Sequence, residues 1–343
     1  MTVRVGVVGV GMIGQDHIRR LSRVLAGVRV VAVTDVDPAR AAQVAAGLPG
    51  VRVLATGKDL VDDDTVDAVV VTSWGPTHEE YVLASIAAGK PVFCEKPLAE
   101  TPEACLRILD AEVAGGRRWV QVGYMRRYDP GYRALKDVVD SGAIGAPLIV
   151  HCAHRNPSVP GHYTKAMAIT DTAVHEIDTM RWLLGEEIIG TQVLTPRASR
   201  HGGDLQDPLI ILFELESGAI VDVEVSVNIR YGYDIRAEVV GEDGTAALGE
   251  ASQVVVRREG GVSSPVPADW RERFLRAYDV EFQEWVDSVA GSTGPQGPGP
   301  WGGSAASAWD GYAASAVSDA ALEAMNTGTK TSVKLVDKPD LYR

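Results

Sequence analysis

Cysteine is scarce in this chain, which has three cysteines in 343 residues: Cys94, Cys105 and Cys152. Their number is odd, they are scattered, and no C-x-x-C pair occurs. The sequence therefore offers no disulfide framework of the kind that stabilises small secreted proteins. We expect reduced thiols and a cytoplasmic protein.

Long apolar runs and an excess of positive charge are also missing. No hydrophobic stretch approaches the ~20 residues that a membrane-spanning helix needs. The first residues enter a strand-like pattern without the basic and apolar regions of a secretory signal. Lysine and arginine number 33 against 46 aspartates and glutamates, which gives a net charge of −13. This charge argues against binding to nucleic acid or to an anionic membrane.

The composition that remains is that of a globular protein, 45% hydrophobic and 23% charged, in a chain long enough for two domains. Its first 35 residues are the most informative. An apolar run at 3–9 predicts a buried strand, and the sequence at 9–14 matches G-x-G-x-x-G. Helical spacing follows at 15–25, and a second apolar run at 28–34 ends on Asp35. This succession is typical of a dinucleotide-binding domain.

Each residue of this pattern has a physical task. Gly9 permits a tight turn out of the strand, Gly11 lets the backbone approach a pyrophosphate, and Gly14 lets the helix pack close to the sheet. The helix N-terminus offers N–H groups to the phosphates. Asp35 is expected to hydrogen-bond the ribose 2′-hydroxyl and to repel a 2′-phosphate, so NAD is favoured over NADP. Arg40 lies nearby and leaves some use of NADP open.

Alternating strands and helices continue to the end of residues 1–123, where we predict a Rossmann domain with a parallel sheet and helices on both faces. Beyond it, strands follow one another with tight turns. Valines at 221–227 alternate with polar residues, as in an antiparallel sheet with one buried face. The fold class is therefore α/β, with a second, α+β domain at 124–343 for substrate binding and oligomerisation. That domain is predicted to contain a large, open, mostly antiparallel sheet, an amphipathic helix at 270–289 and a Pro/Gly-rich loop at 291–303.

Ligands of open parallel sheets bind beyond the carboxyl ends of the strands. Segments 73–78 and 95–97 are predicted to lie there, beside the glycine turn. Lys96 follows a buried strand and precedes a proline, a position that suggests a cis peptide. A lysine near a nicotinamide ring can stabilise the negative charge that develops on a substrate oxygen. An ordinary surface lysine is the alternative interpretation.

Asp171 and His175 are four positions apart in a helix predicted at 171–184, which would place both side chains on one face. A carboxylate beside an imidazole fixes its tautomer and raises its basicity, as a general base requires. The alternative is a capped helix with a structurally satisfied histidine. Thr179 stands where a zinc-binding H-E-x-x-H helix needs its second histidine, so no metal site is predicted.

Three further segments, 124–128, 151–156 and 231–233, are dense in hydrogen-bond donors and acceptors. Such density suits a polyhydroxylated ligand better than it suits a packed core. Arg127 and Arg155 are the members that we expect to lie on the solvated surface.

On these residues the chain resembles the glucose–fructose oxidoreductase/inositol dehydrogenase family over nearly its whole length. The marks of the family are the glycine motif, Glu95-Lys96-Pro97 and the Asp-x-x-x-His helix. Longer strings resemble its inositol 2-dehydrogenase branch; they lie at 122–130, 149–157, 171–178 and 231–235. The resemblance implies NAD-dependent oxidation of myo-inositol at C2 to the ketone, and a homotetramer built through the open sheet.

The resemblance also assigns roles to single residues. It implies that Lys96, Asp171 and His175 are catalytic, and it leaves open whether His175 or Lys96 is the base. The implied substrate site consists of Lys96, Arg126, His154, Asn156, Asp171, His175 and Tyr233, with Tyr231 as a competitor of Tyr233. The expected cofactor residues are Gly9, Gly11, Met12, Ile13, Gly14, Asp35, Val36, Ser73, Trp74, His78, Glu95 and Lys96.

Two other functions are compatible with the sequence. A dehydrogenase of another inositol isomer or of a pyranose sugar would need a similar site, because a ring of equatorial hydroxyls looks alike in all of them. A non-catalytic, dinucleotide-sensing regulator on the same fold could keep the glycines and lose the chemistry. The joint presence of Lys96, Asp171 and His175 argues against the regulator.

Overall fold

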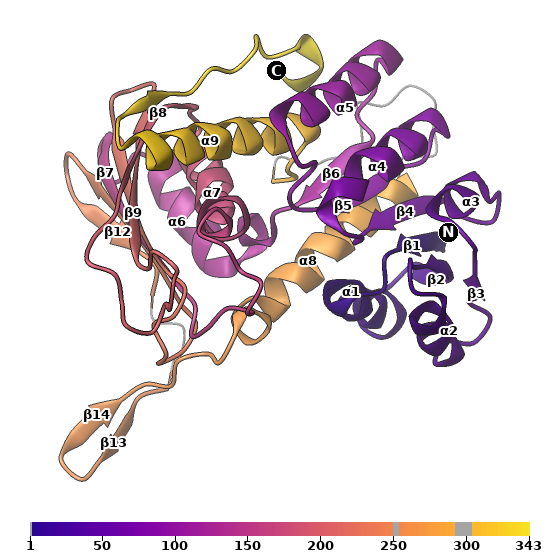
Figure 1. The fold of residues 1–343 in the computed structure, drawn as a ribbon, viewed down its shortest axis with the longest axis horizontal. Coiled ribbons are helices and arrows are strands. Elements are labelled where there is room, and N and C mark those ends of the chain that lie inside the picture. Colours follow the sequence, from indigo (N-terminus) through magenta and orange to yellow (C-terminus); the bar gives the residue numbers. More distant parts are fainter. Residues whose placement is uncertain (1, 250–253, 292–303) are drawn as a thin grey trace. The chain divides into compact units, whose positions relative to one another are not determined.

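The structure is a computed structural model that describes residues 2–249, 254–291 and 304–343 (Figure 1). Contacts within the chain define two compact units. The first unit comprises Met1–Met125, Tyr278–Ser315 and Leu335–Arg343, and the second comprises Arg126–Ala277 and Ala316–Lys334. The chain therefore returns to the first unit twice after residue 125. Residues 292–303 of the predicted Pro/Gly-rich loop lie outside the described residues.

The first unit contains a six-stranded sheet in the order β3-β2-β1-β4-β5-β6, and every neighbouring pair is parallel. The strands are β1 Val3–Val8, β2 Val28–Thr34, β3 Arg52–Val53, β4 Ala68–Val71, β5 Val92–Glu95 and β6 Val120–Gly123. Valine-rich runs suit such strands because helices cover both faces of the sheet. The strand order reverses between β1 and β4, where dinucleotides bind in doubly wound sheets. The predicted Rossmann fold is confirmed.

Local chemistry explains where the helices of this unit begin. The helices are α1 Met12–Arg23, α2 Pro38–Ala46, α3 Gly57–Asp62, α4 His78–Ala87 and α5 Pro102–Gly115. Asp37 accepts hydrogen bonds from the first turn of α2, while Thr56 and Asp59 form a reciprocal capping box at α3. Helix α1 differs, because the residue before it is Gly11, which has no side chain to cap the helix. The first N–H groups of α1 are therefore left for a ligand.

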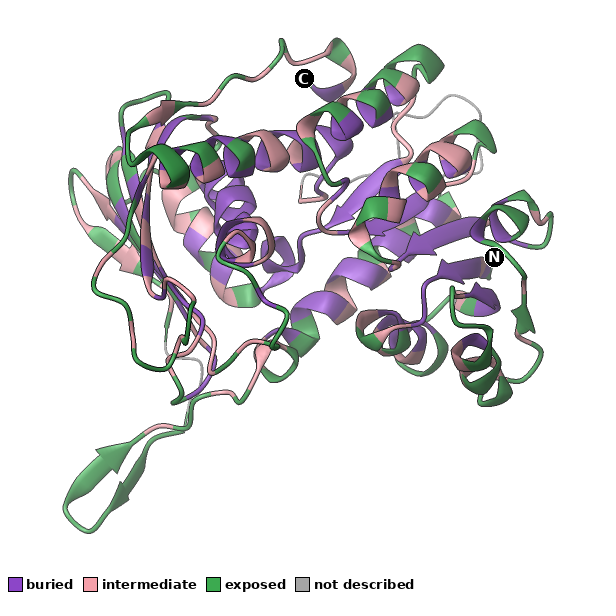
Figure 2. Ribbon diagram, in the orientation of Figure 1, coloured by how far each residue is buried: buried purple, intermediate pink, exposed green. Residues whose placement is uncertain are grey.

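Helix α8, Trp270–Gly291, confirms the predicted amphipathic helix. Its second half belongs to the first unit. There Phe282 and Trp285 are fully buried in one cluster with Val5 of β1 and Phe93 of β5. This half of α8 thus completes the apolar core over one face of the parallel sheet, whose strands β4, β5 and β6 are buried along their whole length (purple in Figure 2).

The second unit is built on a seven-stranded sheet in the order β12-β11-β7-β10-β9-β8-β15. The pair β7–β10 is parallel and the other pairs are antiparallel. The strands are β7 Pro147–Arg155, β8 Ile188–Leu194, β9 Leu209–Leu215, β10 Ile220–Ser226, β11 Asp234–Gly241, β12 Thr245–Ala247 and β15 Thr331–Ser332. Alternate residues of β9, β10 and β11 are buried, so the sheet has one core face. This confirms the predicted mostly antiparallel sheet.

Helices α6 Pro130–Asp140, α7 Val174–Leu184 and α9 Ala308–Thr327 complete the fold, and the boundary between the units falls within α9. The prediction of one regular helix at 171–184 is wrong at its start. Residues Ala168–Ala173 form a π-helical turn, and the α-helix begins only at Val174. Asp171 therefore lies in the wider turn, and the simple four-residue spacing to His175 does not describe their geometry.

A separate two-stranded hairpin lies outside the large sheet. Strand β13, Val256–Arg258, pairs with β14, Gly261–Ser263, and both are exposed along their whole length (green in Figure 2). Among the described residues, no helix is long and apolar enough to cross a membrane.

Candidate active site

The glycine turn between β1 and α1 has the geometry that its motif requires. Gly9 has a φ of +91°, and a Cβ there would lie 2.5 Å from the Cα of Ser73, just past the end of the neighbouring strand β4. A Cβ on Gly14 would lie 2.2 Å from the carbonyl oxygen of Gly9. Gly11 faces open space, with no atom within 4 Å of an added Cβ. The first and third glycines thus permit close packing, and the second leaves room for a pyrophosphate.

Asp35 directly follows β2 and bonds the glycine turn. Its Oδ2 accepts the N–H of Val10 at 2.7 Å, and its Oδ1 is 2.6 Å from the guanidinium of Arg40. Burial raises the pKa of Asp35, but hydrogen bonds from Arg40 and from backbone N–H groups lower it by a larger amount. The pKa of Asp35 therefore lies below its usual range. The carboxylate is therefore charged at neutral pH, as a ribose-binding acid should be. Arg40 is held as its counter-ion.

Apolar side chains are also exposed where strands of this parallel sheet end. Val36 is 97% exposed, Trp74 is 77% exposed and Met12 is 64% exposed, and each follows directly on a glycine turn or a strand end of the parallel sheet. Ile13 is half-buried in the first turn of α1. Large apolar side chains that stay exposed at the carboxyl ends of parallel strands indicate a surface that another molecule covers. These residues, together with the three glycines, fit a dinucleotide.

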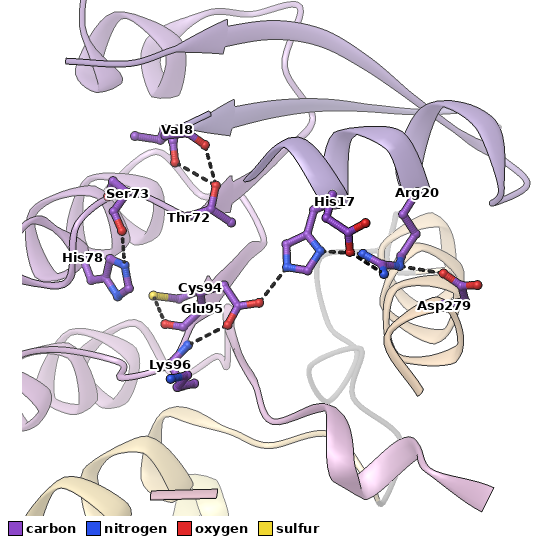
Figure 3. A network of polar contacts seen from close by, with 12 residues as sticks. Val8, His17, Arg20, Thr72, Ser73, His78, Cys94, Glu95, Lys96 and Asp279 are labelled. Carbon is purple, nitrogen blue, oxygen red and sulfur yellow. Dashed lines mark hydrogen bonds and ion pairs between the residues drawn. The ribbon is translucent and has the colours of Figure 1, made fainter. Parts of the chain in front are cut away.

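Lys96 lies just past the end of β5, and its bond to Pro97 is cis, as predicted. Figure 3 shows the carboxylate of Glu95 beside it: Oε2 accepts the backbone N–H of Lys96 at 3.2 Å, and Oε1 lies 2.6 Å from Nε2 of His17. His78 is buried, with Nδ1 2.7 Å from the carbonyl oxygen of Pro97. The side chains of Glu95 and His78, which the sequence assigned to the cofactor, are thus occupied by groups of the protein.

In the second unit, the predicted polar residues form a buried cluster. The guanidinium of Arg126, 1% exposed, forms an ion pair with Glu176 and lies 3.1 Å from Nδ1 of His154. The same Nδ1 lies 2.9 Å from Oε2 of Glu176. The hydroxyl of Tyr233 is 3.5 Å from the other ring nitrogen of His154. The ring of His175 lies 6.2 Å from that of His154, so all five residues belong to one site.

Charge and burial fix the state of this cluster. Burial raises the pKa of Glu176, but the charges of Arg126 and His154 outweigh it, and the pKa lies below its usual range. Burial raises the pKa of Tyr233 to about 12. Glu176 is therefore an anion and Tyr233 a neutral phenol at neutral pH. Arg126 can only donate to Nδ1 of His154 and Glu176 can only accept from it, so these two contacts compete for one ring nitrogen, while Nε2 faces the hydroxyl of Tyr233.

Two further predicted substrate residues, Asn156 and Asp171, also belong to the second unit. Asn156 directly follows β7, where its backbone N–H donates to Ser226 at 2.7 Å and its side chain is half-buried. Asp171 is half-buried in the π-helical turn. Such turns are frequent at functional sites because they break the regular ladder of an α-helix. Tyr231 is 50% exposed and bonds Asp234 at 2.5 Å, so it points to different partners from Tyr233.

The expectation that Arg127 lies on the solvated surface is wrong. Arg127 is 4% exposed and makes a two-pronged ion pair with the fully buried Asp178, at 2.9 and 2.5 Å. Arg155 is partly buried between Glu224 and Asp234. Long-range carboxylate partners hold both arginines, and a single sequence gives no sign of such partners.

Sequence reasoning also missed Glu176, His17 and Arg20. Glu176 had a weak signal, because it directly follows the candidate base His175. His17 and Arg20 lie on the inner face of α1, where an apolar residue is the ordinary expectation. In the described ranges no group of three or more His, Cys, Asp or Glu side chains could hold a metal ion.

Comparisons with known proteins agree with this architecture. Residues 3–124 match a family described as "Oxidoreductase family, NAD-binding Rossmann fold", and residues 132–247 match the GFO/IDH/MocA C-terminal domain. Inositol 2-dehydrogenase 3 of Saccharopolyspora erythraea is 58% identical over 344 residues, covering 100% of this chain and 98% of that protein. Inositol 2-dehydrogenase of Pseudomonas fluorescens is 54% identical, with both chains covered completely.

A solved structure is also similar over its full length. The crystal structure of myo-inositol dehydrogenase from Lactobacillus casei, in complex with NAD(H) and myo-inositol, has a TM-score of 0.94 and 40% identity, and 100% of each chain is covered. The matches of both halves of the sequence and the similarity of the whole fold therefore indicate the same family. The chain belongs to the GFO/IDH/MocA family of oxidoreductases, and its first unit is an NAD-binding Rossmann domain.

Proposed function

We propose that this protein oxidises myo-inositol at C2 to the corresponding ketone, with NAD as the hydride acceptor. The observation that carries the proposal is the full-length similarity to a myo-inositol dehydrogenase solved with NAD(H) and myo-inositol. Curated relatives named inositol 2-dehydrogenase, 52–58% identical over the whole chain, support it. The crevice at the glycine turn accounts for the cofactor, and the buried polar cluster of the second unit accounts for a polyhydroxylated substrate.

Lys96, Asp171 and His175 are the proposed catalytic residues. His175 takes the proton of the reacting hydroxyl, and Asp171 orients the imidazole and stabilises its positive charge. Lys96 donates a hydrogen bond to the same oxygen and stabilises its negative charge. When NAD is bound, C4 of its nicotinamide would supply the acceptor for the hydride that leaves C2 as the carbonyl forms.

The polyol is proposed to be held by His154, Asn156 and Tyr233. Nε2 of His154 lies 3.5 Å from the phenol oxygen of Tyr233, and this neutral phenol can donate a hydrogen bond to a substrate hydroxyl or accept one from it. Arg126 was expected to contact the substrate. Its guanidinium is buried against Glu176 and His154, and we propose that it orients His154.

The open sheet supports a homotetramer. Ile149 on β7 is 40% exposed, Ile220 on β10 is 37% exposed and Leu194 on β8 is 42% exposed. A second copy of the chain would cover these side chains. Cys94, Cys105 and Cys152 are buried and free, which suits a reducing compartment such as the cytoplasm. Light scattering of the purified protein tests the assembly, and a monomer at micromolar concentration would refute it.

The deciding experiment measures reduced-nicotinamide formation with NAD against myo-, scyllo- and chiro-inositol and glucose at mildly alkaline pH. Turnover fastest on myo-inositol is the expected result. Faster turnover on another polyol would keep the mechanism and replace the substrate. Binding of NAD without turnover on any of them would favour the regulator that senses dinucleotides.

A further inference from the structure

A buried polar chain connects helix α1 with the turn that carries Lys96, entirely within the first unit (Figure 3). It begins at Asp279 on α8, whose carboxylate is 2.6 Å from Nε of Arg20. Another guanidinium nitrogen of Arg20 is 2.7 Å from Nδ1 of His17. Nε2 of His17 is 2.6 Å from Glu95, and Glu95 accepts the backbone N–H of Lys96.

The donors in this chain can be assigned. A guanidinium group only donates, so Nδ1 of His17 must accept from Arg20. The proton of a neutral ring is then on Nε2 and points to Glu95. Burial lowers the pKa of His17, which agrees with a neutral ring. Arg20 is 0% exposed and also pairs with Asp16 at 2.9 Å, so its charge is balanced within the helix and by Asp279.

Packing leaves His17 little freedom. Its ring centroid is 4.3 Å from that of Phe282 and 6.1 Å from that of Phe93. Both phenylalanines are fully buried. Apolar walls exclude water, so each hydrogen bond of His17 has no solvent substitute. The position of Glu95 therefore depends on His17.

Glu95 in turn has a fixed place. Its Oε2 bonds the peptide N–H of Lys96, and a Cβ on Gly123 of the adjacent strand would come within 3.1 Å of its carboxyl group. On the far side of the turn, Nδ1 of His78 bonds the carbonyl oxygen of Pro97. Buried His17 thus holds the peptide group before Lys96 through Glu95, and buried His78 lies against the carbonyl group of Pro97, one residue after Lys96.

We propose that His17, held by Arg20, is a positioning residue for Lys96. It orients Glu95 so that the Lys96 peptide is fixed relative to α1, the helix whose N-terminus receives the dinucleotide phosphates. His17 acts through Glu95 and touches neither cofactor nor substrate. This role rests on the proposed function, in which Lys96 bonds the reacting oxygen.

The test compares His17→Leu, His17→Gln and Glu95→Gln in the full chain. His17→Leu removes both ring nitrogens and keeps the bulk, whereas His17→Gln keeps a donor that can reach Glu95. Tyr342→Phe is a matched control, because it also removes one donor from a buried carboxylate, that of Glu112, without touching the Lys96 turn. We expect His17→Leu to lower kcat roughly 10- to 100-fold, as a displaced catalytic group would. KM for NAD should change little, and His17→Gln should recover most of the activity.

A second readout does not depend on the substrate. The protein is acetylated with limiting acetic anhydride in the presence of NAD and is then analysed by mass spectrometry. The extent of acetylation of Lys96 reports the surroundings of its amine, and Lys136 serves as the internal reference. His17→Leu should change the labelling of Lys96 and leave that of Lys136 unchanged. The double variant His17→Leu/Glu95→Gln should have a kcat no lower than that of the less active single variant, because both changes break the same chain of hydrogen bonds.

Several results would overturn the proposal. One such result is that His17→Leu has the same kcat as Tyr342→Phe and that Lys96 is acetylated at the same rate in both variants. Another is weaker NAD binding with unchanged labelling, since His17 would then serve α1 alone. If His17→Leu does not fold, the double variant of His17→Gln and Glu95→Gln takes its place. Additive effects of these two changes on kcat would also overturn the proposal. If the wild-type protein oxidises no polyol, the proposed function fails, and the labelling experiment still decides the role of His17.

Discussion

Glu112 of α5 is the group from which the clearest pH dependence follows. It is fully buried, and its carboxylate accepts the backbone N–H groups of Trp119 and Val120 and the hydroxyl of Tyr342, close to the C-terminus. Burial raises its pKa, the three hydrogen bonds lower it in part, and the result is a pKa of about 7 against 4.5 for an ordinary glutamate. This difference corresponds to about 3 kcal/mol of folding free energy.

The direction of the change of stability with pH depends on whether the folded or the unfolded state binds the proton of Glu112 more tightly. The folded pKa is raised, so the contribution of Glu112 to stability is fully present below pH ~4.5 and is lost as the pH rises through about 7. Glu112→Gln should abolish this loss. The amide keeps every hydrogen bond, because its oxygen accepts the two backbone N–H groups and its nitrogen donates to Tyr342.

The assay is calorimetric melting of the wild type and Glu112→Gln between pH 5 and pH 8. The difference in Tm between them should grow with pH in favour of the variant, by roughly 6 °C at about 2 °C per kcal/mol. Taking the difference at each pH cancels the buried histidines His17 and His78, whose depressed pKa values give the opposite slope. Tyr342→Phe is the control, because it keeps the carboxyl group of Glu112 but removes a hydrogen bond that lowers its pKa. The loss of stability should therefore occur at higher pH in this variant. A Tm difference that does not change with pH would refute the reasoning.

Three predictions concern catalysis and cofactor choice. His175→Ala should lower turnover roughly 10²- to 10⁴-fold with NAD binding intact, as loss of a general base does; normal steady-state turnover would exclude His175 as the base. Lys96→Met should lower kcat roughly 10²- to 10³-fold, and an unchanged kcat would show that Lys96 does not share the reacting oxygen. Asp35→Ser should release Arg40 from its 2.6 Å ion pair. It should also shift the kcat/KM ratio of NADP to NAD at least ~10-fold, or about 1.4 kcal/mol; an unchanged ratio would contradict the proposed role of Asp35.

Features set by near neighbours in the chain were predictable from the sequence. The glycine turn needs only a strand before it and a helix after it, and Gly9 and Gly14 pack as the motif predicts. The position of Lys96 before a proline suggested the cis bond that is observed. Alternation of valines with polar residues gave the sheet of the second unit its buried face. In each case a pattern of a few residues determines the local backbone.

Features set by distant partners were not predictable. Arg20 and Asp279 are 259 positions apart, and nothing in either segment announces the other. The same holds for the return of the C-terminal segments to the first unit, where Tyr342 meets Glu112 across 230 positions. The π-helical turn at Ala168–Ala173 is a local feature, but its inserted geometry reflects tertiary packing, and the sequence there resembles an ordinary helix start.

Two of the missed residues, His17 and Glu176, take part in the same kind of arrangement. Lys96 directly follows Glu95, and His175 directly precedes Glu176, and each of these buried carboxylates bonds a buried histidine: His17 for Glu95 and His154 for Glu176. Buried ionic groups contribute little net stability, because desolvation offsets their attraction. They do fix geometry, since every alternative arrangement leaves a charge without a partner in a dry interior. The buried carboxylates beside Lys96 and His175 are therefore better explained by precise positioning of those two residues than by stabilisation of the fold.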